Sequence, residues 1–351
     1  MMKSFPLEKV YQIGDRVNKA VSKPKKIKNI PVISIGNLTT GGTGKTPAAI
    51  YFVKMLQEMH MKPAILTRGY GGTIYREGGI LSDGKLMLLS ERESGDEPYL
   101  LAVNLPGVPI AVGKNRYENG LKLARLFDID VFVLDDGFQH YGLKREVDIV
   151  LIDATKPFGN GHVLPHGTLR ESPEALKRSH IIIITKASLI SGEKKIELIE
   201  EIKKSAGHDK IFESNHNPSL FVKLPVTYDF DSSMNWKTEK LQMIKNKKVW
   251  ALSGIGNHQA FEKTLLSLGA AAVESISFRD HYRYTLKDVL GIIKRIGKDD
   301  YLITTEKDWI RLQYFREHFH ALNRFYFLAI NFGILKDEGT LINEMKEILN
   351  V

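Results

Sequence analysis

The chain has 351 residues, of which 43% are hydrophobic and 26% charged, values typical of a globular protein with a sizeable core. It contains no cysteine, which excludes a disulfide scaffold, a cysteine-ligated metal site and a cysteine nucleophile. No apolar run approaches the roughly 20 residues that span a bilayer, and the N-terminus lacks the apolar core of a secretory signal, so we expect a soluble or peripheral protein of the cytoplasm.

The positive charge of the chain is concentrated in residues 1–30. The net charge is +9, and these thirty residues carry +6 of it. We expect a basic amphipathic helix here, because apolar residues recur at helical spacing and Pro24 then ends the pattern: Leu7, Val10, Tyr11, Val17 and Val21. Two interpretations stay open, a helix on an anionic lipid surface and a helix docked on the core with a solvated basic face.

Residues 31–211 are predicted to form a mostly parallel sheet with helices on both faces. Short apolar segments alternate with helical ones, which is typical of α/β proteins. Strands are expected at 31–36, 63–67, 109–113, 131–135, 149–153 and 181–185, with helices that include 44–60 and 115–127.

The rest of the chain divides into two predicted parts. Residues 212–248 are interpreted as a linker with short strands. Residues 249–351 are expected to form a smaller α/β domain with strands at 249–253, 273–278, 301–305 and 324–330 and a final amphipathic helix with the stripe Leu341, Ile342, Met345, Ile348 and Leu349.

A glycine-rich loop follows the first predicted strand and precedes its helix. It reads Gly41-Gly42-Thr43-Gly44-Lys45-Thr46. Glycines let backbone N–H groups approach an oxyanion, and the helix N-terminus adds positive potential, so the fold expected is that of a P-loop NTPase. Lys45 is expected to reach the β- and γ-phosphates, and the Thr46 hydroxyl to ligate Mg²⁺. The strict pattern has glycine where this chain has Thr39.

An acidic pair ends another predicted strand. Asp135 and Asp136 follow the apolar run 131–134, at the carboxyl end of a strand, where ligands sit in open α/β sheets. Either carboxylate is a candidate for the metal, directly or through water.

Two classes of P-loop protein fit the sequence poorly. Readout of guanine normally needs Lys-x-Asp after an apolar strand, and Lys186 is followed by Ala187 and Ser188, so ATP is the expected nucleotide. A partition-type ATPase carries lysine immediately before the two glycines, where this chain has Thr40.

An ordered series of motifs resembles the tetraacyldisaccharide 4′-kinase family, the lipid A 4′-kinases. Segment 36–47 resembles the phosphate loop of that family, including the non-glycine residue at position 39. Further matching segments cover about residues 31–310 in order: Thr67-Arg68-Gly69-Tyr70-Gly71-Gly72, Ser94-Gly95-Asp96-Glu97-Pro98, Leu134-Asp135-Asp136-Gly137-Phe138-Gln139-His140, Leu164-Pro165 with Leu169-Arg170-Glu171, Gly254-Ile255-Gly256-Asn257, Phe278-Arg279-Asp280-His281 and Thr304-Thr305-Glu306-Lys307-Asp308. Departures are Ser172 before Pro173, Tyr282 where a second histidine is frequent, and a less apolar N-terminal segment.

The resemblance implies a reaction and a catalytic set. The γ-phosphoryl of ATP, with Mg²⁺, would pass to the 4′-hydroxyl of a tetraacylated glucosamine disaccharide 1-phosphate. Asp96 matches the aspartate thought to accept the hydroxyl proton, supported by the histidine that matches His281, and Lys45 completes the set. Because Asp96 and His281 lie far apart in the chain, we expect domain closure to complete the site and exclude water.

Other candidates carry weaker signals. The nucleotide is expected to contact Gly41, Gly42, Thr43, Gly44, Lys45, Thr46 and Tyr70. The acceptor substrate is expected to contact Glu97, Arg116 and Arg170. The metal is expected to contact Thr46, Asp135, Asp136, Gln139 and Glu171. Either arginine could equally make a structural ion pair. His140 either orients Asp136 or makes a structural hydrogen bond.

The expected location is the cytoplasmic face of the bacterial inner membrane. Residues 1–30 would attach the protein peripherally, since each basic residue near an anionic leaflet contributes roughly 1 kcal/mol. The sequence indicates neither nucleic acid nor an obligate protein partner. One rival function is a phosphotransferase acting on a soluble sugar or nucleoside, which dependence on detergent or acyl chains separates from a lipid kinase. The other is a regulatory nucleotide switch or partition-type ATPase, which slow hydrolysis stimulated by a protein partner, with no small acceptor, would indicate.

Overall fold

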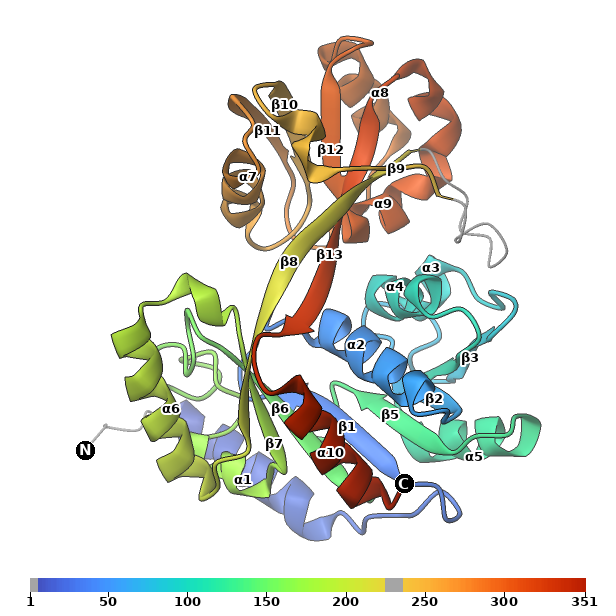
Figure 1. Cartoon of the computed structure of the whole chain (residues 1–351). Coiled ribbons are helices and arrows are strands. Elements are labelled where there is room, and N and C mark those ends of the chain that lie inside the picture. The colour runs from blue at the N-terminus through green and yellow to red at the C-terminus, as the bar shows by residue number, and fades with distance from the viewer. Residues whose placement is uncertain (1–5, 225–235) are drawn as a thin grey trace.

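The computed structural model describes residues 6–224 and 236–351, and they form two lobes joined by a long two-stranded ribbon (Figure 1). We call the part built on the first seven strands the large lobe, and the part built around residues 236–330 the small lobe. The P-loop-type α/β fold expected from the sequence is confirmed.

The sheet of the large lobe is parallel except at one edge. The order of its strands is β3-β4-β2-β5-β1-β6-β7, and β3 runs antiparallel to β4. Since β1 lies between β5 and β6, the loops that follow these three strands meet at the same edge. The strands are β1 (Val32–Asn37), β2 (Pro63–Thr67), β3 (Gly79–Asp83), β4 (Pro109–Val112), β5 (Val131–Asp135), β6 (Val147–Asp153) and β7 (Ile181–Thr185).

Helices cover both faces of this sheet because its strands are buried on both sides. Phe52 of α2 is fully buried in a core that α2 shares with α4, whereas Leu123 of α5 and Leu198 of α6 pack on the opposite face. The helices are α1 (Pro6–Val21), α2 (Lys45–Glu58), α3 (Glu91–Ser94), α4 (Asp96–Asn104), α5 (Arg116–Leu126) and α6 (Gly192–Ala206), with a 3₁₀ helix at Pro173–Arg178.

The small lobe repeats the α/β arrangement around its own core. Trp309 is fully buried there, and its ring meets that of Phe325 edge-on, with centroids 5.9 Å apart. The elements are β9 (Thr238–Glu239), β10 (Lys248–Ser253), α7 (His258–Ser267), β11 (Ala272–Ser277), α8 (Leu286–Arg295), β12 (Tyr301–Thr305), α9 (Glu306–Leu312) and a 3₁₀ helix at Gln313–Ala321.

The joining ribbon differs from the linker expected at 212–248. It consists of β8 (Ile211–Lys223), which continues the large-lobe sheet beside β7, and the antiparallel β13 (Phe325–Ile334), which continues the small-lobe sheet beside β12. One sheet therefore runs through both lobes. The remainder of the expected linker includes residues 225–235, which lie outside the described residues.

The final helix also departs from expectation. We expected it within the domain 249–351, but α10 (Glu338–Leu349) returns to the large lobe beside α2 (Figure 1). Its Leu341 and Met345 are fully buried in the core that contains Phe52. The periodicity of a sequence shows which face of a helix is apolar, but not which core receives that face.

Candidate active site

A cleft of about 1740 Å³ lies between the lobes at the carboxyl ends of β1 and β5. The large lobe contributes the glycine-rich loop, the Arg68–Tyr70 loop, the start of α4 and the end of β5. The small lobe contributes the segment before α8 and the start of α9. Of the predicted site residues, the cleft is lined by Gly41, Gly42, Thr43, Lys45, Thr46, Tyr70, Asp96, Glu97, Asp135, Asp136, Arg170 and His281.

The glycine-rich loop has the backbone geometry of a phosphate cradle. Gly41 and Gly44 take φ values of 117° and 88°, which residues other than glycine rarely adopt, and α2 begins directly at Lys45. The loop is braced from within, because the Asn37 amide donates to Thr43 Oγ1 at 2.9 Å and Lys45 Nζ donates to Asn37 Oδ1 at 3.3 Å. The N-terminus of α2 thus faces the cleft with its positive end.

Two neighbouring strands support this loop from below. The Thr185 hydroxyl at the end of β7 donates to the carbonyl of Thr43 at 3.2 Å, and Lys186 Nζ donates to the carbonyl of Gly42 at 3.3 Å. The ring of His216 on β8 lies against Gly44, where a Cβ would come within 2.2 Å of its Nε2 atom. Lys186 and His216 carried no functional signal in the sequence beyond the missing guanine motif.

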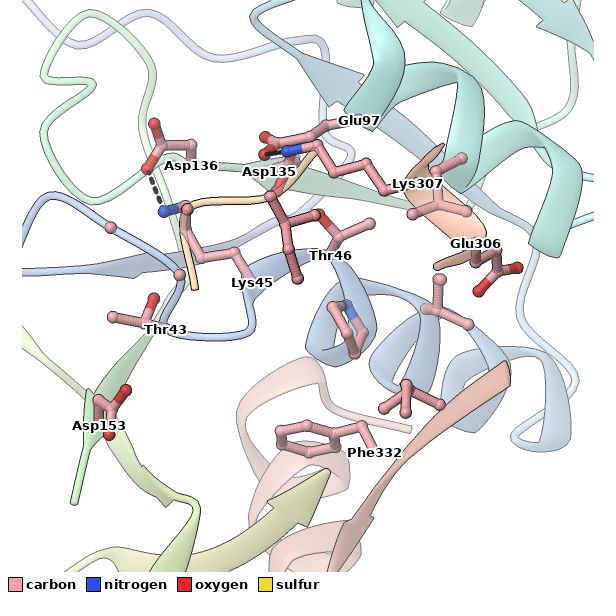
Figure 2. A pocket seen from close by; sticks show the side chains of 18 of the residues that line it. Thr43, Lys45, Thr46, Glu97, Asp135, Asp136, Asp153, Glu306, Lys307 and Phe332 are labelled. Carbon is pink, nitrogen blue, oxygen red and sulfur yellow. Dashed lines mark hydrogen bonds and ion pairs between the residues drawn. The ribbon is translucent and has the colours of Figure 1, made fainter. Parts of the chain in front are cut away.

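The two aspartates at the end of β5 have different surroundings. Asp136 is neutralised by Arg170, whose Nη1 lies 2.9 and 3.0 Å from the two carboxylate oxygens, and by Lys45 at 3.5 Å (Figure 2). Asp135 accepts a hydrogen bond from the Thr67 hydroxyl at 2.9 Å. Burial, together with the charge of Asp136, raises the pKa of Asp135 to about 6. Asp135 is therefore the carboxylate that an added cation would stabilise most.

The donor set suits Mg²⁺ shared with a nucleotide. No group of three or more histidine, aspartate and glutamate side chains in the described part of the chain is arranged to hold a metal alone. Mg²⁺ commonly uses one or two carboxylates, with phosphate oxygens and waters as the other ligands. Asp135 and Thr46 lie at the same end of the cleft (Figure 2), and their oxygens fit that requirement.

Gln139 and Glu171 lie behind the cleft rather than in its wall. The Gln139 amide donates to Glu171 Oε1 at 3.0 Å, and Arg178 donates to the same oxygen at 2.9 Å. Glu171 Oε2 accepts from the Tyr141 hydroxyl at 3.0 Å. With these partners Glu171 holds the segment after Arg170 in place, and neither predicted metal ligand lines the cleft.

Asp96 and His281 come together across the cleft from opposite lobes. Asp96 is the first residue of α4, after Gly95 at φ 93°, and His281 lies in the small-lobe loop at φ 54°. His281 Nδ1 lies 3.0 Å from Asp96 Oδ2. Only 7% of the Asp96 side chain is exposed, against 43% for His281, so the histidine is the accessible member of the pair.

The charges around this pair favour an ionised carboxylate. Burial would raise the pKa of Asp96, but the hydrogen bond with His281 and the positive charges of Lys307 and Arg311 lower it to about 2. The hydrogen bond with Asp96 raises the pKa of His281 above its usual value. The two groups therefore form a carboxylate–imidazole unit that can take up one proton.

Arg116 and Tyr70 occupy contrasting positions. Arg116 does not line the cleft; it is 6% exposed, and its Nε has no hydrogen-bond partner among the described residues. Burial and the neighbouring Arg68 lower the pKa of Arg116 to about 10. Burial and the nearby charges of Arg116 and Arg145 lower the pKa of His140 to about 3, so this imidazole is neutral. Tyr70 is 74% exposed on its glycine-rich loop at the cleft.

Comparison with known families accounts for this arrangement. Residues 5–350 match the family described as tetraacyldisaccharide-1-P 4′-kinase. The chain belongs to this family. It is therefore a kinase, as the resemblance of its motifs implied.

Individual members of the tetraacyldisaccharide 4′-kinase family align over most of their length. The enzyme of Desulfatibacillum aliphaticivorans is 40% identical over 283 residues, covering 80% of this chain and 74% of the relative. The enzyme of Halothermothrix orenii is 38% identical over 313 residues, covering 87% and 81%. Both carry the name tetraacyldisaccharide 4′-kinase.

A solved structure shows the same two-lobed kinase fold. The crystal structure of LpxK from Aquifex aeolicus in its "apo" form, in complex with ATP, superposes with a TM-score of 0.74. It is 27% identical in sequence, and the match covers 97% of this chain and 96% of the other.

Proposed function

We propose that this kinase transfers the γ-phosphoryl group of ATP to the 4′-hydroxyl of a tetraacylated glucosamine disaccharide 1-phosphate. The observation that carries the proposal is the Asp96–His281 pair, joined at 3.0 Å across the cleft that the phosphate loop also lines. Phosphoryl transfer needs a cradle for the phosphates and a group that receives the hydroxyl proton, close together in one site. The names of the relatives support this acceptor.

The large lobe supplies the nucleotide site. Backbone N–H groups of residues 41–46 and Lys45 Nζ would bind the β- and γ-phosphates, and Tyr70 lies near enough to the cleft to contact the nucleotide or sugar. Bound Mg²⁺ would neutralise developing charge on the phosphate oxygens, held by Thr46 and Asp135. Asp136 orients Lys45 and Arg170, while Gln139 and Glu171 fix Arg170 from behind.

The acceptor hydroxyl is placed between the lobes. We assign its proton to the Asp96–His281 pair, in which Asp96 is the acceptor that the family resemblance implies and His281 supports it. As the attacking oxygen bonds to phosphorus, the bond to the leaving oxygen of ADP breaks and the pair takes the hydroxyl proton. Glu97 lines the cleft next to Asp96, and Arg170 lines it beside Asp136. Arg116 adds positive charge near Asp136 from behind the cleft wall.

Helix α1 supports attachment to a membrane surface. It docks through polar residues, since Glu8 meets His162 at 3.0 Å and Asp15 meets the Tyr141 hydroxyl at 3.3 Å. Four residues of its predicted apolar stripe face outward with exposures of 54–70%: Leu7, Val10, Val17 and Val21. Ile13 is exposed to the same degree, whereas Tyr11, the fifth residue of the stripe, is 37% exposed. A helix docked on the core would bury that stripe, so the arrangement favours a lipid surface as its partner.

Not all basic residues after α1 are available to bind an anionic membrane surface, because two of them contact the protein itself. Lys25 Nζ lies 4.8 Å from the ring centre of Tyr117, and Lys28 Nζ donates to the carbonyl of Ala124 at 2.7 Å. These two lysines bind the segment to α5.

No helix within the described residues is long and apolar enough to cross a membrane. We therefore propose a peripheral protein of the cytoplasmic face of the inner membrane.

Replacing Val10 and Val17 together by aspartate is expected to weaken binding to phosphatidylglycerol-containing vesicles by about tenfold or more, because the stripe would lose its apolar centre. Co-sedimentation measures the binding. Leu266→Asp on α7, a single change of an exposed leucine in the small lobe, is the control. Equal vesicle affinity for both variants would contradict attachment through α1.

The acceptor class is tested by ADP release. With Mg²⁺ and ATP, release should rise when the acylated disaccharide 1-phosphate is added in detergent micelles, and remain at the basal rate with the same disaccharide after its acyl chains are removed. Equal stimulation by the deacylated sugar would favour a soluble-sugar kinase. Stimulation by neither compound would contradict the proposal.

A further inference from the structure

Lys307, to which no motif of the sequence gives a role, reaches from the small lobe into the proton-accepting site. It is the second residue of α9, whose first turn packs against α4 of the large lobe. Figure 2 shows its amine beside Glu97, at the same end of the cleft as Asp135. The preceding residue reinforces this contact between lobes, because Glu306 accepts a hydrogen bond from Asn104 of α4 at 2.8 Å.

The amine of Lys307 meets three functional side chains. It lies 3.0 Å from Glu97 Oε1, 3.4 Å from His281 Nε2 and 3.8 Å from Asp96 Oδ2. An ammonium group has hydrogens to donate and no lone pair, so it faces the unprotonated nitrogen of the imidazole. The neutral ring of His281 then carries its hydrogen on Nδ1 and donates it to Asp96, which leaves the Nε2 lone pair on the exposed side.

The other charges around the pair do not replace this contact. Arg311 of α9 lies 3.8 Å from Asp96 Oδ2, but it also pairs with Asp308 at 3.2 Å and faces the buried side. Asp280, beside His281 in the chain, lies 3.9 Å from Nε2 and opposes the effect of the lysine. Glu91 of α3 adds negative charge near Asp96. Lys307 is thus the cation that approaches both members of the pair.

We infer that Lys307 is a positioning residue for phosphoryl transfer. Anchored by Glu97, it sets the tautomer of His281 and keeps the pair from taking up an additional proton until the acceptor hydroxyl arrives. The inference rests on the proposed function, in which this pair receives the hydroxyl proton, and it extends that function to a third side chain contributed by the small lobe.

The sign of the electrostatic effect follows from the positions. The positive charge of Lys307 lowers the pKa of both Asp96 and His281, since it opposes adding a proton to either. Removing the charge raises both values, whichever member takes the proton. A base must be unprotonated to act, so the acidic limb of the pH profile of kcat/KM moves to higher pH.

The test is the pH dependence of Lys307→Met with the acylated disaccharide. We expect the acidic limb to move up by about 0.5–1 pH unit, with up to about a tenfold loss of kcat/KM below it and a smaller loss above it. Lys307→Arg keeps the charge and should restore the limb. Lys294→Met, an exposed lysine in the last turn of α8, should leave the profile as in the wild type.

A second measurement is independent of the acceptor. The imidazole resonances of His281, followed by NMR in the full-length protein without substrate, should titrate at higher pH in Lys307→Met than in the wild type. If neither the limb nor this titration moves in folded Lys307→Met, or if Lys307→Arg shifts them as methionine does, the inference is overturned. A wild-type protein that phosphorylates no lipid would refute the proposed function, and the NMR comparison would still decide the role of Lys307.

Discussion

Asp96→Asn is expected to lower the turnover of phosphoryl transfer by about 10³-fold, the size of effect associated with loss of a positioned proton acceptor. Asparagine keeps the shape of the side chain, so the contact with His281 at 3.0 Å can persist while the negative charge is lost. His281→Ala should cause a loss of similar order, and the double variant should lose little more than either single variant, because the two side chains act as one unit.

Nucleotide binding separates this role from a structural one. Neither residue lies in the phosphate loop, so the affinity for ATP should stay within about threefold of wild type in both variants. Equilibrium binding of a fluorescent ATP analogue measures that affinity, and thermal unfolding checks the fold. A large loss of ATP affinity with unchanged turnover at saturating ATP would remove the pair from the chemical step.

Gly44→Ala is expected to reduce kcat/KM for ATP by about 10²-fold, because displacing the loop by about 1 Å misplaces the transferred group. Gly44 has φ 88°, and an added Cβ would lie within 2.2 Å of the ring of His216, a residue of the ribbon strand β8. The strain falls directly on the residue before Lys45. Steady-state kinetics with varied ATP measure the effect.

Two companion variants show where the strain arises. Gly42→Ala should lose far less, since a Cβ at that position meets no atom within 4 Å and its φ is not in the left-handed region. Adding His216→Ala to Gly44→Ala should recover part of the loss by relieving the collision, but not the part due to the backbone angle. Wild-type kcat/KM in Gly44→Ala would contradict the account of the loop.

Local sequence patterns sufficed for the buried strands. The ranges predicted for β2, β5, β7 and β12 agree with the structure to the residue, because each is a short apolar run bounded by turn-forming or charged residues. Of the ribbon, β13 was expected as a strand at 324–330, whereas the residues of β8 were predicted as part of a linker with short strands and form one long strand. Half-buried positions in β8 alternate irregularly, so the period of two on which strand prediction depends is weak there.

The site divides in the same way. The phosphate loop and the Asp135–Asp136 pair could be predicted from local motifs, since the residues that would bind phosphate or metal follow one another directly after a strand. The contact of His281 with Asp96 depends on how two lobes dock, and only the family resemblance indicated it. Lys307 lies in the motif at residues 304–308, but its role depends on its distances to Glu97, His281 and Asp96, which no spacing in the sequence encodes.

The central claim concerns where the phosphoryl group goes. The most direct measurement is ³¹P NMR of the lipid product formed from ATP, Mg²⁺ and a tetraacylated disaccharide 1-phosphate. The account predicts one new phosphomonoester signal per molecule, coupled to the proton at the 4′ position, with the 1-phosphate signal retained. A new phosphate at another position, or consumption of ATP with no new lipid phosphate, would contradict it.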